Sequence, residues 1–543
     1  MERVKGWSPA ASAAGRLGFV GILVAVAAMH QVRAEDIAPS VALVHRYEVT
    51  GNTLLSAAEV ELALGQLPGR MSLADMQAAS SRLQAAYRVA GYGAVIVLLP
   101  EQALDSGVLQ LQVVGGRLRQ LSVTGQQAFS RDNVLRSLPS LSLGTTPSLF
   151  DLDRELLMVN DNPAKNARVV LQPGRSAGDV EALVVVEERP VQRWLLGLDN
   201  SGTPGTGRYR TSVLYQNANL GDRDVVLGLR GVTSPTEPSQ VAVLGSTLRV
   251  PLYGYKTAIE ASVLASNTRS ANNVTPAGDL RFSGTGLSVG ARGVWMLPSL
   301  GELKSQAAFG LDVRDYKTEC SLGVFGAAGC GNANNTLRVL PVTLSYSVQK
   351  LGAQFASVQY VTNVPAGSAG NDADFDASRS GARSHYQLLR LNANAIHRIT
   401  PQWQLNWRAD AQYAPRALVP AEQFGAAGVY SVRGYEERSL VGDSGVATSV
   451  EIRTRLDTFT GQQGGDTVPT LGVFVDAGGV SNRLGTACQP GRSTCGLWSA
   501  GFSLGWAVGP AAVLQLHIAR AGRAIQATER GDWKAHFSFT YSL

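Results

Sequence analysis

The sequence is poor in cysteine, in charge and in long apolar runs, and each shortage excludes a class of protein. Charged residues make up 17% of the 543 residues, whereas glycine occurs 59 times. This balance argues against a disordered chain and against a coiled coil. Beyond the N-terminus no segment holds roughly 18 consecutive apolar residues, so a transmembrane helix is not expected in the mature chain. In a membrane this chain would therefore have to form a β-barrel.

Signatures of catalysis and of cofactor binding are also missing. The segment 501–505 matches G-x-S-x-G, but it lies inside an alternating, strand-like run, whereas a nucleophile elbow needs a strand-to-helix turn. No phosphate-binding loop is present. Beyond the N-terminal 34 residues, five histidines are scattered without ligand or triad spacing: His45, His385, His397, His517 and His536. We therefore expect neither an enzyme nor a cofactor.

The N-terminus has the features of a secretory signal peptide. Basic residues flank the apolar run 17–29, which is too short to span a bilayer, and small residues precede a cut between Ala34 and Glu35. We predict that residues 1–34 are removed. They carry four basic residues and one acidic residue, which is +3 of the formal charge of +6. The basic pI belongs largely to this leader, so no nucleic-acid partner is expected.

The four cysteines form two close pairs in glycine-rich segments. They are Cys320 with Cys330, and Cys488 with Cys495. In an exported chain such pairs predict two short loops closed by disulfides. No histidine lies near either pair and the CxxC spacing of zinc ligands is absent, so no metal site is predicted.

Residues 35–190 contain one pattern twice. In the first copy, capping boxes at Ser56 with Glu59 and at Ser72 with Asp75 open two helices, 56–64 and 72–87, between strands at 44–50, 94–99 and 108–113. The second copy predicts helices at 130–138 and 150–159, with strands at 118–123, 167–171 and 180–187. Each unit is a three-stranded sheet covered by two helices. Its open strand edge can accept an extended peptide as an added strand, although the units can also be rigid spacers.

The rest of the chain alternates between apolar and polar residues. From 402 to 413 the alternation is complete, and Trp403 and Tyr413 stand near its ends. A soluble β-sandwich has the same period of two, but a strand of about 10 residues with aromatic ends indicates a bilayer-spanning barrel. Similar runs, such as 284–296 and 306–313, bring the number of predicted strands to sixteen. An even number leaves both ends of the barrel in the periplasm.

This strand count assigns the loops to the two sides of the membrane. Every odd-to-even connection faces outward, so the two cysteine pairs fall in the fourth and seventh external loops. Arg433 falls in the sixth loop, at about 414–445. The last strand places Phe537, Phe539, Tyr541 and Leu543 on one face, similar to the C-terminal signal of outer-membrane barrels, with Leu in place of the usual terminal aromatic.

Two short motifs carry the candidate site. The first is Val432-Arg433-Gly434-Tyr435, where the glycine permits a tight turn and the aromatic can fix the loop, so that one guanidinium is placed accurately. The second lies on the thirteenth predicted strand, where alternation points Phe474, Asp476 and Gly478 into the lumen. An inward carboxylate can receive a cation through two parallel hydrogen bonds. Glu451, inward on the twelfth strand, is the competing partner, and these charges can also simply line a wet lumen.

These features resemble the POTRA-barrel superfamily, which includes BamA and TamA. Within it they are similar to the two-partner secretion transporters, the hemolysin-activator and filamentous-hemagglutinin exporters. The runs Asn160-Asp161-Asn162-Pro163 and Leu171-Gln172-Pro173-Gly174 look like those of the second POTRA domain in these transporters. The resemblance implies POTRA 1 at 35–116, POTRA 2 at 117–190 and a 16-stranded antiparallel barrel at 191–543. It also implies that the sixth loop folds back into the pore, where Arg433 bonds Asp476.

The function implied by the resemblance is protein export through the outer membrane. The POTRA domains would capture a large secreted protein of the adhesin or cytolysin class, and the barrel would pass it outward unfolded. Other implied partners are the barrel-assembly machinery, periplasmic chaperones and outer-membrane lipids. Only about ten residues separate Ala34 from Val44, so we expect no helix that plugs the pore.

Two other functions compete with export. A factor that inserts barrels into the membrane would be expected to have more POTRA copies. A passive porin or receptor would need neither the periplasmic repeats nor the pair of motifs.

Overall fold

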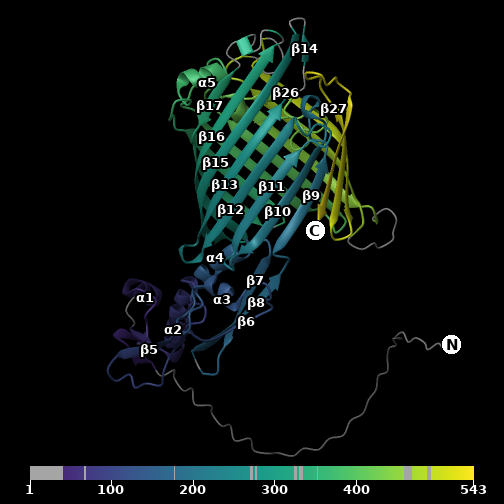
Figure 1. Ribbon diagram of the computed structural model, residues 1–543. Coiled ribbons are helices and arrows are strands. Elements are labelled where there is room, and N and C mark those ends of the chain that lie inside the picture. The colour runs from purple at the N-terminus through teal and green to yellow at the C-terminus, as the bar shows by residue number, and fades with distance from the viewer. Residues whose placement is uncertain are drawn as a thin grey trace, which may run out of the picture.

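In the computed structural model of the chain, two small α/β units lie below one end of a tall β-barrel (Figure 1). The structure describes residues 41–543, except 66–68, 177, 270–272, 276–277, 323, 325–326, 329–333, 351, 458–466 and 486–490. The predicted leader, its cut after Ala34 and most of the segment in which we expect no plug helix lie outside the described residues. Among the described residues, no helix has the length and apolar character needed to cross a membrane.

The first unit has the predicted β-α-α-β-β order. Both predicted capping boxes form, with Ser56 and Ser72 as the N-cap residues of the two helices. The sheet order is β2-β5-β4, with β2 and β5 parallel, and β1 pairs with β3 beside it. The elements are β1 (Ala42–Leu43), β2 (Arg46–Thr50), α1 (Ala57–Leu64), β3 (Arg70–Met71), α2 (Leu73–Val89), β4 (Ile96–Leu98) and β5 (Val108–Val114).

The second unit repeats this order and contacts the barrel. Its sheet order is β6-β8-β7, with β6 and β8 parallel. The elements are β6 (Arg117–Thr124), α3 (Arg131–Arg136), α4 (Leu149–Val159), β7 (Lys165–Pro173) and β8 (Asp179–Glu188). Lys165 donates to Asp224, in the turn 221–224 of the barrel, at 2.6 Å, and both side chains are buried. Because a buried ion pair is costly to separate, this contact fixes the unit against the barrel rim.

The barrel closes with the predicted sixteen long antiparallel strands, if the short strands β14 and β17 are counted as extensions of the wall. The last strand, β28, pairs with the first, β9, along Ser538–Ser542 and Leu195–Asp199. The wall strands are β9 (Gln192–Asp199), β10 (Arg210–Leu220), β11 (Val225–Thr233), β12 (Val241–Leu252), β13 (Thr257–Arg269), β14 (Asn273–Thr275), β15 (Gly278–Leu300), β16 (Leu303–Leu322), β17 (Asn335–Val339), β18 (Pro341–Lys350), β19 (Gln354–Asn363), β20 (Gln387–Arg398), β21 (Trp403–Tyr413), β24 (Ser444–Arg455), β25 (Thr470–Ser481), β26 (Thr494–Val508), β27 (Ala512–Ala521) and β28 (Trp533–Ser542).

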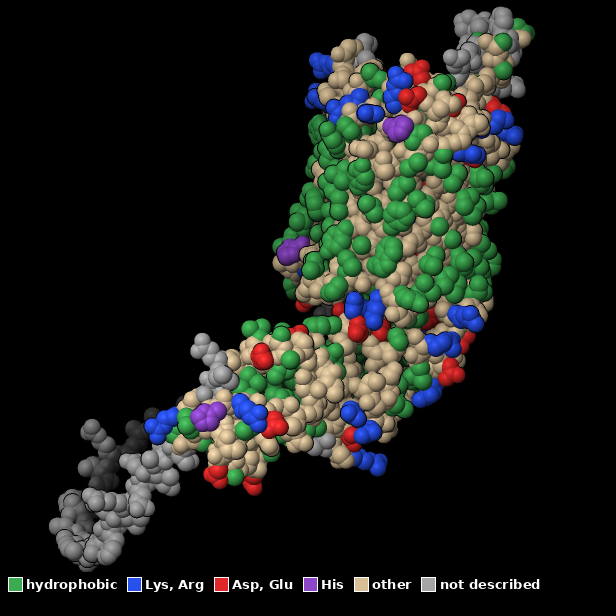
Figure 2. Space-filling view, turned by 90° about the vertical axis from the view of Figure 1, so that its left-hand side faces the viewer, with side chains coloured by type: hydrophobic (Ala, Val, Ile, Leu, Met, Phe, Trp, Pro, Cys, Tyr) green, Lys and Arg blue, Asp and Glu red, His purple; other side chains and the backbone are tan. Residues whose placement is uncertain are grey.

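The outer face of the barrel is apolar, as the alternation predicts. On β21 the aromatic residues Trp403, Trp407 and Tyr413 are exposed on the outside, whereas Gln412 is buried inside. Figure 2 shows a broad hydrophobic band across the visible face of the barrel, with Lys, Arg, Asp and Glu gathered above and below it. This is the pattern of a barrel whose wall faces lipid and whose ends face water.

Two hairpin strands are longer than predicted. The sequence predicts strands at 284–296 and 306–313, whereas β15 and β16 pair from Leu280 with Leu322 to Leu300 with Leu303. Backbone pairing needs no apolar outer face, so the ladder continues beyond the part that alternation marks. Cys320 therefore lies on a strand and not in an irregular loop. Its predicted partner Cys330, and Cys488 of the other pair, lie outside the described residues, so both pairings stay predictions.

Candidate functional site: the buried arginine of the sixth loop

The sixth external loop, residues 414–443, is called loop 6 below. It joins β21 to β24, which begins at Ser444, close to the predicted bound of 445. Loop 6 folds back into the barrel, and its side chains Val432, Tyr435 and Leu440 form a buried apolar cluster with Val480 of β25 and Leu497 of β26. Within the loop, β22 (Phe424–Gly425) pairs with β23 (Val441–Gly442). The loop is therefore a packed element of the lumen.

The tip of loop 6 depends on Gly434 and Tyr435. Gly434 has φ +92°, and a Cβ there would lie 3.2 Å from the Cβ of Ala519. Both facts favour glycine, because other residues rarely adopt this backbone conformation and the space is closed. The Tyr435 hydroxyl donates to the carbonyl oxygen of Trp498 at 2.9 Å and accepts from the N–H of Arg523 at 3.1 Å. The aromatic of the motif thus ties the tip to the barrel wall.

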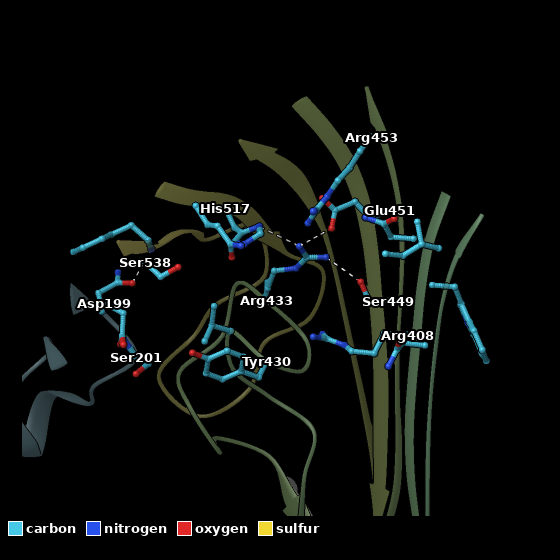
Figure 3. A pocket seen from close by; sticks show the side chains of 18 of the residues that line it. Asp199, Ser201, Arg408, Tyr430, Arg433, Ser449, Glu451, Arg453, His517 and Ser538 are labelled. Carbon is cyan, nitrogen blue, oxygen red and sulfur yellow. Dashed lines mark hydrogen bonds and ion pairs between the residues drawn. The ribbon is translucent and has the colours of Figure 1, made fainter. Parts of the chain in front are cut away.

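Arg433 is 4% exposed, and all five of its side-chain N–H groups have acceptors. Nε donates to Asp476 Oδ2 at 2.7 Å and Nη2 donates to Asp476 Oδ1 at 2.8 Å, which is the bidentate arrangement expected for this pair. Nη2 also donates to Ser449 Oγ at 3.0 Å. Nη1 donates to Glu451 Oε2 at 3.2 Å and to His517 Nδ1 at 3.1 Å. Figure 3 shows the guanidinium between Ser449, Glu451 and His517. A fully satisfied guanidinium is fixed in position as well as in charge.

The two candidate acid partners are not alternatives, since Arg433 contacts both. Asp476 is 0% exposed and accepts three N–H groups of Arg433, including the backbone N–H at 3.0 Å. Glu451 accepts one, and it also receives Arg453 Nε at 2.6 Å and the hydroxyl of Ser503. Asp476 is therefore the principal partner of the arginine, and Glu451 is shared with other donors.

Phe474 and Gly478 complete the second motif around the same arginine. Cζ of Arg433 lies 3.3 Å from the centre of the Phe474 ring, so the cation stacks on an aromatic face. A Cβ at Gly478 would lie 3.0 Å from Cγ2 of Val432. The small residue thus leaves room for the valine of the first motif, and the two motifs fit together residue by residue.

Two further acids hold the base of loop 6 and were not found in the sequence. Glu422 is buried and pairs with Arg314 of β16 at 2.8 Å and with Arg390 of β20 at 3.1 Å. Asp443, also buried, pairs with Arg379 and accepts the N–H of Arg483 at 2.7 Å. These partners are far apart in the sequence and have no shared spacing, so no motif marks them.

The carboxyl group of Asp443 is poised by opposing effects. Burial opposes its ionisation, but hydrogen bonds from Arg379 and from the N–H groups of Arg483 and Leu418 favour it. The balance holds the pKa of Asp443 below its ordinary value, so the group is charged at neutral pH. The ion pair of Asp443 with Arg379 thus holds the base of loop 6 together with those of Glu422.

Two histidines dismissed as scattered also reach the site. His517 Nδ1 accepts from Arg433, and His536 Nε2 accepts the N–H of Gly434 at 3.3 Å. They are partners across the β27–β28 ladder. The period of two along each strand points them inward, and this is the only sequence signal that could have found them.

A cavity of about 310 Å³ remains in the lumen beside Arg433. It is lined by residues that include Arg408, Tyr430, Glu451, Arg453 and His517 (Figure 3). In the described part of the chain, no group of three or more His, Cys, Asp or Glu side chains is placed to hold a metal ion. The predicted G-x-S-x-G segment lies within strand β26, where no strand-to-helix turn exists. The arrangement can hold or release a loop, and it offers no nucleophile elbow.

Comparisons with curated proteins find transporters. Outer membrane transporter CdiB of Escherichia coli O6:K15:H31 is 25% identical over 416 residues, which are 74% of this chain and 67% of CdiB. Heme/hemopexin transporter protein HuxB of Haemophilus influenzae is 25% identical over 152 residues, which are 28% of this chain and only 27% of HuxB. The chain thus matches about a quarter of the length of HuxB and two thirds of CdiB.

Solved structures show the same fold. CdiB from Escherichia coli aligns with a TM-score of 0.76 at 18% identity, over 95% of this chain and 93% of that one. CdiB from Acinetobacter baumannii aligns with a TM-score of 0.69 at 17% identity, over 93% and 90%. At these identities the likeness concerns the fold alone.

Family descriptions cover most of the described chain. Residues 42–116 match the ShlB-type POTRA domain. Residues 181–508, more than half of the 543, match the haemolysin secretion/activation protein family ShlB/FhaC/HecB. Members of this family are transporters with a β-barrel in the outer membrane and POTRA domains in the periplasm, and this chain has the same location. With its closed barrel and its POTRA-type units, the chain belongs to the haemolysin secretion/activation protein family ShlB/FhaC/HecB.

Proposed function

We propose that this protein is a pore that binds a large secreted protein through its POTRA domains and translocates it, unfolded, to the cell surface. The observation that carries the proposal is loop 6, which packs inside the barrel and is held there by Arg433. A polypeptide can pass only if the tip of this loop moves, so the lock formed by Arg433, Asp476 and Glu451 acts as a gate. No covalent step is involved, and we expect no enzymatic activity. The cargo belongs to the adhesin or cytolysin class, and its folding outside supplies the driving force.

The edge strand of the first unit is less open than the sequence suggests. At the middle of β4, the N–H of Val97 donates to Gln84 at 3.3 Å, and its carbonyl accepts from the hydroxyl of Ser80 at 2.8 Å. Both side chains come from α2. A peptide that added here as a strand would first have to displace them, which costs hydrogen bonds.

The second unit offers a longer edge, on β7. The Asn160 side chain bonds both the N–H and the carbonyl of Ala167, at 2.6 and 3.0 Å, so residue 167 faces away from β8. By alternation the backbone groups of Val169 and Leu171 face the same way, and β7 is the outer strand of its sheet. We place the binding of an extended cargo segment at this edge. At Val169 and Leu171 a new strand can form backbone hydrogen bonds without displacing the Asn160 side chain, which bonds Ala167.

A proline substitution tests this edge without breaking the sheet. Val169→Pro removes one outward N–H, which proline lacks, and keeps the bonds between β7 and β8. We expect cargo secretion to fall while the barrel still shows a heat-dependent shift in gel mobility. Val170→Pro is the matched control for damage to the sheet, because the N–H of Val170, which proline lacks, faces β8. Normal secretion by Val169→Pro would move cargo binding away from β7.

Gene deletion tests the function as a whole. We expect one large protein to disappear from the culture medium or cell surface, and the outer-membrane barrels to stay at normal levels. Broad loss of barrel proteins would instead indicate a factor for barrel insertion. Unchanged secretion together with lower uptake of small solutes would indicate a passive porin or receptor.

The proposal also covers how the protein reaches its place. Export would use the leader 1–34 with cleavage after Ala34, and periplasmic chaperones and the barrel-assembly machinery would deliver the chain to outer-membrane lipids. Disulfides Cys320–Cys330 and Cys488–Cys495 would close two external loops in this oxidising compartment.

A further inference from the structure

Two histidine rings contact the tip of loop 6 from neighbouring strands. His517 on β27 and His536 on β28 are opposite each other in the ladder. His517 contacts the guanidinium of Arg433, and His536 contacts the backbone N–H of Gly434. The ring of His517 also meets the Phe474 ring edge-on, with centroids 6.2 Å apart. Each histidine therefore contacts one residue at the tip of loop 6, His517 the locking Arg433 and His536 the adjacent Gly434.

The donors at these contacts fix the proton positions on both rings. An arginine N–H and a backbone N–H can only donate, so Nδ1 of His517 and Nε2 of His536 must be unprotonated acceptors. The second nitrogen of His536, Nδ1, is buried and has no hydrogen-bond partner among the described residues. Each ring must therefore be neutral for loop 6 to be held as it is.

Adding a proton to either ring would place two N–H donors face to face. Around His517 lie Arg433 of loop 6, Glu451 and Arg453 of β24, and Asp476 of β25. The two acids there already pair with the two arginines, so they are not free to stabilise an imidazolium.

His536 has a similar set of charged neighbours. It faces His517, Arg433, Glu436 of loop 6 and Lys534 of its own strand. Glu436 already pairs with Lys534 at 2.7 Å. His517 lines the 310 Å³ cavity, so its ring borders an open space in the lumen.

We infer that His517 and His536 are proton-sensitive positioning residues of the gate: neutral rings hold the tip of loop 6, and their protonation in acid releases it. The inference rests on the proposed role of Arg433 as the lock. It adds that acidification alone opens this pore.

The test uses the purified full chain in planar lipid bilayers, with the open probability measured at pH 7.5 and pH 5.5. If the released state binds one more proton, linkage allows up to about a tenfold change per pH unit. We therefore expect the open probability of the wild type to rise by roughly ten- to a hundredfold over this range.

The discriminating variant is His517→Asn with His536→Gln. Asparagine places an oxygen near the position of Nδ1 and glutamine places one near Nε2, so both acceptors stay but neither takes up a proton. We expect this variant to stay closed at both pH values. His397→Gln, which changes an exposed ring on β20, is the matched control and should keep the acid response.

The possible outcomes separate the two proposals. The Arg433→Ala pore should be open at both pH values. If it is closed, Arg433 is not the lock, and the proposed gate is refuted. If Arg433→Ala opens, a wild type without acid response, or a double variant that keeps the response, would overturn the role of the histidines alone. Should the double variant fail to fold, His517→Asn alone must reduce the steepness of the response, and an unchanged slope would overturn the inference.

Discussion

Replacement of Asp476 by asparagine is the sharpest perturbation of the lock. Asp476 accepts three N–H groups of Arg433, and the side chain is fully buried. Asparagine has the same size, but it has one acceptor oxygen, and its amide group would direct N–H toward N–H. The substitution also leaves the charge of Arg433 with Glu451 alone, which already pairs with Arg453.

The expected effect follows from the burial of the pair. Breaking a buried ion pair by removing one partner costs about 3–5 kcal/mol. Since about 1.4 kcal/mol is a factor of ten, the population of the released tip should rise by roughly a hundredfold to several thousandfold. Tyr435 and the ion pairs of Glu422 and Asp443 are untouched, so the tip should move while the base of loop 6 stays in place.

Glu451→Gln is the matched control for this prediction. Glutamine keeps an acceptor for Arg433, and the carboxylate it replaces is shared with Arg453 and Ser503. We expect a cost of about 1 kcal/mol, less than a tenfold change. Single-channel recordings at neutral pH compare the two variants, with cargo secretion as the second assay. Equal or greater opening by Glu451→Gln would refute the ranking of the two acids.

Four further predictions concern the tip and the base of loop 6 and the junction of the second unit with the barrel. Arg433→Ala should impair secretion while a folded, heat-modifiable barrel remains. Gly434→Ala, strained at positive φ, should destabilise the locked state by about 1–2 kcal/mol, which heat-dependent gel mobility would show as a lower thermal midpoint. The pKa of Asp443 is lowered, so the stability that its charge gives to the base of loop 6 is complete above the ordinary carboxyl pKa of about 4 and is lost as the pH falls through the lowered pKa. In the wild type, acid-stable proteases should therefore cut loop 6 only in that acid range. In Asp443→Asn they should cut it at neutral pH as well. Lys165→Met leaves Asp224 buried and unpaired, so the second POTRA-type unit should detach from the rim at a cost of about 3–5 kcal/mol, measured by cross-linking of the unit to the barrel, and an unchanged cross-linking yield would contradict this account.

The gate has several ion pairs at different depths. Arg433 holds the tip in the lumen, whereas Glu422 and Asp443 hold the base through arginines. Separate anchors allow the tip to open without unfolding the loop.

Much of the fold could be predicted from the sequence because its signals are local. Ser56 with Glu59, and Ser72 with Asp75, open helices through contacts three residues apart. Alternation along each strand follows from the geometry of a single strand, so the strand number and the inward side chains of Phe474 and Asp476 could be derived without knowing any neighbour. The position of Arg433 in the sixth loop then followed from counting.

Only the tertiary structure decided the contacts between segments that are far apart in the chain. Closing the barrel brings β27 and β28 against loop 6, so His517 and His536 meet residues 84 and 102 positions away. Glu422 finds Arg314 and Arg390 across the lumen for the same reason. Sharing of Arg433 between Asp476 and Glu451, and the covering of Val97 by α2, also depend on distances that no periodicity encodes. Alternation tells each side chain which face it occupies, and only the packing of the loop against the closed wall decides which partner it meets there.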